Sequence, residues 1–127
     1  MKTLVFGFAL ADSMFENGVP DNIPQVIRRT NLSPASAVRL LEKSREEGTL
    51  VVACNPSHKA SIEAAKVRYG IGVDIPATPP RVWVAPGDSL LVMGVRGLPR
   101  LTDRHEYTAE EVDGASFSFS LYEVLGG

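Results

Sequence analysis

The sequence has little of what metal sites, disulfides and membrane spans require. Its 127 residues include one cysteine and two histidines. Cys54 therefore has no partner for an internal disulfide, and it falls in an apolar run that predicts a buried, reduced thiol. His58 has no Cys, His or Asp at ligand spacing, so we expect no metal and no cofactor. No apolar run approaches the roughly 18 residues that cross a bilayer.

An excess of basic charge is also missing. The formal net charge is −2, which argues against a wide surface for long nucleic acid. A small anionic ligand needs only a local cationic pocket and stays possible. Met1 to Leu10 is too short for a signal peptide, so we expect a cytoplasmic protein with no membrane partner. With 44% hydrophobic and 22% charged residues, residues 1–127 fit one domain.

Apolar and alternating runs predict the strands of a sheet. The expected strands are residues 3–10, 49–54, 81–85, 89–95 and 117–121, with a further extended segment at 23–29. The segments 81–85 and 89–95 are joined at Pro86-Gly87-Asp88, which indicates a hairpin or a tight connection.

Capping signals predict the helices. Ser33 with Pro34 marks the start of a helix that Gly48 ends. Thr108 and Glu111 form a capping-box signature for a short third helix. The expected fold is α/β, a mixed sheet of about five strands flanked by about three helices.

His58 lies where a strand gives way to a helix. Asn55-Pro56 breaks the chain after the strand at 49–54, Ser57 is the expected N-cap, and the helix covers 58–69. Free backbone N–H groups in a first helical turn favour an anion, and an imidazole there can donate a proton to a leaving oxygen. A lone histidine at a helix start also fits a surface or capping residue.

A second cationic feature is the loop at residues 96–105. It holds Arg96, Arg100 and Arg104, together with Asp103 and His105. Guanidinium groups match phosphate oxygens bidentately, so this loop suits a phosphate clamp. A solvated turn is the alternative.

Read from end to end, the chain resembles the viral ring nucleases, a family of archaeal-virus and phage proteins that act as type III anti-CRISPR proteins. Three stretches carry the resemblance: VFGFALADSMF at 5–15, EEGTLVVACNPSHKASIEAAKVRYG at 46–70, and RLTD at 100–103. Within them His58 falls on the family's histidine, and Arg100 falls on the arginine of an Arg-Leu-Glu-Glu run. The segments DSLLVMGV and SFSLYEV resemble the family's later strands.

The resemblance implies a function. Members of that family are homodimers that bind cyclic tetraadenylate and cleave it without metal, by attack of a ribose 2′-hydroxyl on the adjacent phosphate. For this chain the resemblance implies that His58 is the general acid and that Arg100 stabilises charge on the phosphate. It also implies that Asp103 orients either Arg100 or His58. The expected ligand-binding residues are Ala11, Ser13, Ser57, Lys59, Ser61 and Arg96.

This chain departs from the family's pattern in the pocket. Ala11 and Ala60 stand where the family has serines, Phe8 replaces an asparagine, and Asp103 is shorter than the family's glutamate. Altered ligand preference, or slower cleavage with retained binding, would follow from such changes. Two alternatives to the enzyme thus stay open: a binding-only sponge for the cyclic nucleotide, and a nucleic-acid-binding or structural viral protein.

Overall fold

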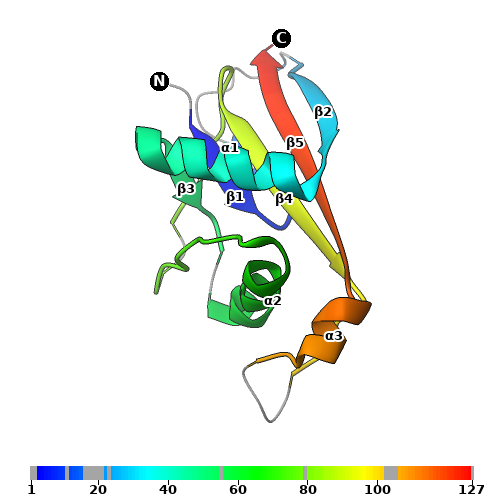
Figure 1. Ribbon diagram of the computed structural model, residues 1–127. Helices are drawn as coiled ribbons and strands as arrows, with labels where there is room; N and C mark the ends of the chain where they lie inside the picture. Colours follow the sequence, from blue (N-terminus) through cyan, green and yellow to red (C-terminus); the bar gives the residue numbers. More distant parts are fainter. Residues whose placement is uncertain are drawn as a thin grey trace.

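The computed structural model describes residues 3–10, 12–15, 22, 24–54, 56–78, 80–101 and 106–126. They form one mixed sheet with three α-helices, which confirms the predicted α/β class (Figure 1). The elements in chain order are β1 (Leu4–Gly7), the 3₁₀-helix η1 (Asp12–Phe15), β2 (Val26–Leu32), α1 (Pro34–Glu47), β3 (Leu50–Val52), the 3₁₀-helix η2 (Pro56–His58), α2 (Lys59–Tyr69), β4 (Ser89–Arg96), α3 (Ala109–Gly114) and β5 (Ser116–Gly126).

The sheet has the strand order β2-β5-β4-β1-β3. β1 pairs in parallel with both β3 and β4, whereas β5 runs antiparallel to β4 and β2. β1 is therefore an interior strand with parallel neighbours on both sides. Among the described residues, no helix combines the length and the apolar character that crossing a membrane requires.

The capping signals of α1 and α3 produce the expected helix ends. The Ser33 hydroxyl accepts a hydrogen bond from the Ser36 amide at 3.2 Å, and Gly48 ends α1 in the left-handed conformation with φ 72°. The predicted capping box of α3 also forms, because Thr108 and Glu111 each bond the other's backbone amide.

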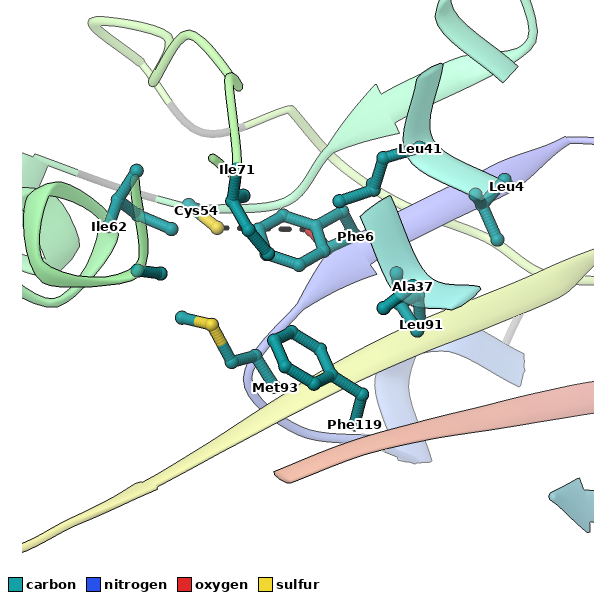
Figure 2. Packing of buried hydrophobic residues seen from close by; sticks show 11 residues of the cluster. Leu4, Phe6, Ala37, Leu41, Cys54, Ile62, Ile71, Leu91, Met93 and Phe119 are labelled. Carbon is teal, nitrogen blue, oxygen red and sulfur yellow. Dashed lines mark hydrogen bonds between the residues drawn. The ribbon is translucent and has the colours of Figure 1, made fainter. Parts of the chain in front are cut away.

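Both long helices pack against one face of the sheet. Their buried residues meet those of the strands in one core, which comprises Leu4, Phe6, Ala37, Leu41, Cys54, Ile62, Ala65, Ile71, Leu91, Met93 and Phe119 (Figure 2). As predicted, Cys54 is buried, and its thiol lies 3.8 Å from the Phe6 carbonyl oxygen. α1 and α2 thus bury the side of β1 that carries Leu4 and Phe6.

The opposite face of the sheet is covered by an irregular segment, and here the prediction of a strand at 81–85 is wrong. Val84 is fully buried beside Val5 and Leu90 of that face. The Val84 amide donates to the Met14 carbonyl oxygen at 2.8 Å, so the segment is anchored to η1 and joins no strand. The alternating pattern reflects one buried side of an extended chain, which does not require pairing in a sheet.

Candidate functional site

Parallel pairing brings the carboxyl ends of β1, β3 and β4 to one edge of the sheet. Phe8, Ala53 and Gly97 are the residues that immediately follow these strands. The chain returns to β3 on one side of β1 and later to β4 on the other side, so β1 is a topological switch point. Open α/β sheets bind their ligands at this position, outside the carboxyl ends of the strands. This edge is the candidate site.

His58 lies at this edge, but its local geometry differs from the prediction. Pro56, Ser57 and His58 form the 3₁₀ turn η2, and His58 itself is the N-cap of α2, without a side-chain capping bond. The prediction of Ser57 as the N-cap is therefore wrong. Proline fixes its own φ near the helical value, so the turn starts at Pro56 and moves the beginning of the α-helix onward.

The His58 ring packs against Phe8, which follows β1. The two ring centroids are 4.3 Å apart and the planes are inclined by 32°. Partial burial lowers the pKa of His58 below its ordinary value of 6.5, because an apolar neighbour disfavours the imidazolium.

A cavity of about 430 Å³ opens beside the segment that follows β1. Its lining residues are Ser13, Met14, Ala53, Pro80, Arg81 and Val82. Ser13 belongs to the predicted ligand set, and Ala53 directly follows β3. Arg81 is a cation of this cavity that sequence analysis misses. The sequence indicates this position of Arg81 only weakly, because Arg81 and Trp83 alternate with the inward-facing Val82 and Val84.

A larger cleft of about 600 Å³ lies between α2, the end of α1 and residues 72–77. Lys59 lines this cleft with Arg45 and Lys66, and the carboxylates of Glu63 and Asp74 balance part of their charge. Lys59 and Ser13, both predicted to bind the ligand, thus line different hollows.

The remaining predicted residues lie on exposed or partly exposed positions. Arg96 ends β4 and Arg100 follows four residues later, both exposed, and neither lines the two cavities. Ser57 is exposed in η2, and Ser61 is half-buried in α2. Asp103 and Ala11 lie outside the described residues. Among those that are described, no group of three or more His, Cys, Asp or Glu could hold a metal.

The segment that carries Arg100 begins at Gly97 and is linked to α2 through α3. Arg68 of α2 donates to the Val112 carbonyl oxygen at 3.0 Å and to the carbonyl oxygen of Ala115, at the end of α3. Gly97 has a φ of 85° and packs so closely on α3 that a Cβ there would lie 3.2 Å from the Gly114 carbonyl oxygen. Helix α2, which follows His58, and the segment that carries Arg100 therefore both contact α3.

Comparison with known proteins places the fold. No protein-family model matches the chain, and no curated protein does. Among solved structures, B116 of Sulfolobus turreted icosahedral virus matches with a TM-score of 0.69 over 95% of this chain and 98% of that one. The chain shares its fold with a viral protein. Sequence identity to B116 is 19%, so this likeness concerns the fold.

Proposed function

We propose that this chain is a viral ring nuclease that binds a cyclic oligoadenylate and cleaves it without metal. The first candidate ligand is cyclic tetraadenylate. Cleavage of this second messenger would suppress type III CRISPR signalling. The observation that carries the proposal is the position of His58, at the carboxyl edge of β1 and β3 and at the start of α2. The family resemblance around His58 and the fold shared with a virus protein support it.

The proposed step is a transesterification. A ribose 2′-oxygen forms a bond to the adjacent phosphorus and loses its proton to solvent, while the bond from phosphorus to the 5′-oxygen breaks. His58 gives its proton to that leaving oxygen, and the product ends in a 2′,3′-cyclic phosphate and a 5′-hydroxyl. Arg100 neutralises charge on the phosphate.

The pKa of His58 sets a condition on this step. Burial lowers it in the free protein, whereas a bound phosphate favours the imidazolium and opposes that shift. Turnover should therefore fall as the pH rises through the pKa that His58 has in the complex. A sponge that binds without cleaving is the second candidate function. The alanine at position 11, where the family has a serine, and the short carboxylate of Asp103 favour it.

Incubation with cyclic tetraadenylate in EDTA, followed by chromatography, tests the proposal. Linear products support the enzyme, and binding without products supports the sponge. If the protein neither binds nor cleaves the ring, the nucleic-acid-binding or structural alternative remains.

His58→Ala should retain folding and binding while slowing cleavage by about a hundredfold or more, as for loss of a general acid. Lys43→Ala, an exposed position of α1, is the control. Unchanged turnover in His58→Ala would remove His58 from the mechanism.

A two-fold assembly fits this ligand. A ring of four equivalent phosphates presents the same group to each of two subunits related by two-fold symmetry. We therefore expect a homodimer in solution, with the His58 edges of both subunits near a shared groove. Light scattering measures the assembly directly, and a monomer that cleaves the ring at full rate would contradict it.

A further inference from the structure

Trp83 is the only tryptophan of the chain, and its side chain is not buried in the core. It is 44% exposed. The guanidinium carbon of Arg81 lies 5.1 Å from the centroid of its ring. A guanidinium at this distance from an indole makes a cation–π contact, which orders both side chains on the surface.

The segment that carries this pair is firmly held from below. Val84 is fully buried against the sheet and its amide bonds to Met14 of η1, while Val82 packs partly on the same cluster. Arg81 and Trp83 alternate with these valines, and both are exposed. The pair is therefore presented outward by a backbone that is anchored on both the sheet and η1.

One member of the pair, Arg81, also lines a cavity. Arg81 lines the hollow of about 430 Å³ that Ser13 and Ala53 share at the carboxyl edge of β1 and β3. Pockets that take small ligands begin at about 300 Å³, so this hollow has room for a nucleotide-sized group. Trp83 does not line the hollow itself, but it contacts Arg81, which does. An aromatic ring next to a cavity that offers a cation and a hydroxyl matches a ligand that has a flat base, a sugar and a phosphate.

We propose that Trp83 is a stacking platform for a nucleobase, with Arg81 holding its indole in place, and that the sugar–phosphate of the same nucleotide enters the adjacent cavity. The chemical class of the ligand is an adenine nucleotide, and this choice of base rests on the proposed function. Stacking of a base on an aromatic side chain does not depend on cleavage, so the platform is testable separately.

The single tryptophan makes the test direct. Its fluorescence is titrated with AMP and with cyclic tetraadenylate, using ribose 5-phosphate as the probe that lacks a base. We expect saturable quenching by both adenine compounds and none by ribose 5-phosphate. AMP has no bond that the proposed reaction cleaves, so quenching by AMP separates binding at the platform from the cleavage reaction.

Calorimetry on variants supplies the second measurement. Trp83→Ala should weaken the Kd for cyclic tetraadenylate roughly fivefold to a hundredfold, the range for loss of one base–aromatic stack, and Trp83→Phe should lose less. Quenching without any cleavage would contradict the proposed enzyme and leave the platform supported. Tight binding with an unchanged Kd in Trp83→Ala would overturn the platform alone. If the tryptophan fluorescence changes with protein concentration and not with nucleotide, Trp83 lies at an interface between copies of this chain. That result would also overturn the platform.

Discussion

The contact between His58 and Phe8 leads to a prediction with two separable readouts. Phe8 is half-buried, with its ring centroid 4.3 Å from that of His58 and 6.5 Å from that of Phe6. Phe8→Ala removes the ring, and Phe8→Leu keeps apolar bulk without aromatic character. The pair of variants separates burial of the imidazole from stacking upon it.

The stability cost follows from these contacts. A fully buried Phe→Ala change costs about 3–5 kcal/mol, so we expect about 2 kcal/mol for the half-buried Phe8. Phe8→Leu should cost about 0.5–1.5 kcal/mol, the part due to aromatic pairing. At about 4 °C per kcal/mol for a chain of this size, Phe8→Ala should lower the Tm by about 8 °C.

The second readout is the titration of His58. Burial lowers its pKa, so the folded protein binds fewer protons than the unfolded chain near that pH. The neutral form of His58 therefore favours the folded state. This stabilisation is fully present above the pKa of about 6.5 that histidine has in the unfolded chain, and it is lost as the pH falls through the pKa of His58 in the folded protein. Phe8→Ala should raise the pKa of His58 toward its ordinary value, with Phe8→Leu between the two.

Proton NMR of the imidazole C2 protons measures this pKa. The sequence has two histidines, so His58→Asn identifies the resonance by its disappearance. Phe117→Ala is the control, because Phe117 is also half-buried but packs edge-on against Tyr69 at 5.4 Å. It should lower the Tm and leave the His58 titration unchanged. If His58 instead titrates above 6.5 and Phe8→Ala lowers its pKa, the attraction between imidazolium and ring outweighs burial, and the reasoning is refuted.

Three further outcomes are expected. Arg100→Ala should weaken ligand binding and cleavage more than Arg104→Ala, because Arg100 lies in the matched motif; equal losses in calorimetry and turnover would indicate a diffuse basic patch. Gly97→Ala should cost about 1–3 kcal/mol in urea unfolding, since its φ is 85° and the added Cβ meets backbone. Gly114→Ala, in α3 with open space around it, should be neutral or stabilising by up to about 1 kcal/mol, and a similar loss at both glycines would contradict the strain argument. Burial raises the pKa of Cys54 to about 11, so a thiol reagent at pH 8 should react only as fast as the fold opens; the rate of an exposed cysteine would show that the thiol is accessible.

The helix ends and the strand-to-helix junction at His58 could be predicted from the sequence because their causes are local. Ser33 caps α1 through its own hydroxyl, and Gly48 ends the helix through its own backbone freedom. The alternation from Phe117 to Leu121 likewise marks a strand, and β5 covers it. The strand is buried on both sides and not on one, because Ser120 and Val124 are buried as well as Phe119. Even within this range, the N-cap moved from Ser57 to His58, because the turn beginning at Pro56 occupies the preceding residues.

The neighbours of each element were decided only in the tertiary structure. Nothing in the local sequence states that β1 lies between β3 and β4, which is what brings His58, Phe8 and Ser13 to one edge of the sheet. The segment at 81–85 has the alternation of a strand, yet its hydrogen bond goes to Met14 of η1. Alternation reports which side of an extended chain is buried, whereas the partner of its backbone depends on what the rest of the fold places beside it. That placement, and not any pattern around Trp83, brings Arg81, with Trp83 against it, into the wall of the cavity that Ser13 lines.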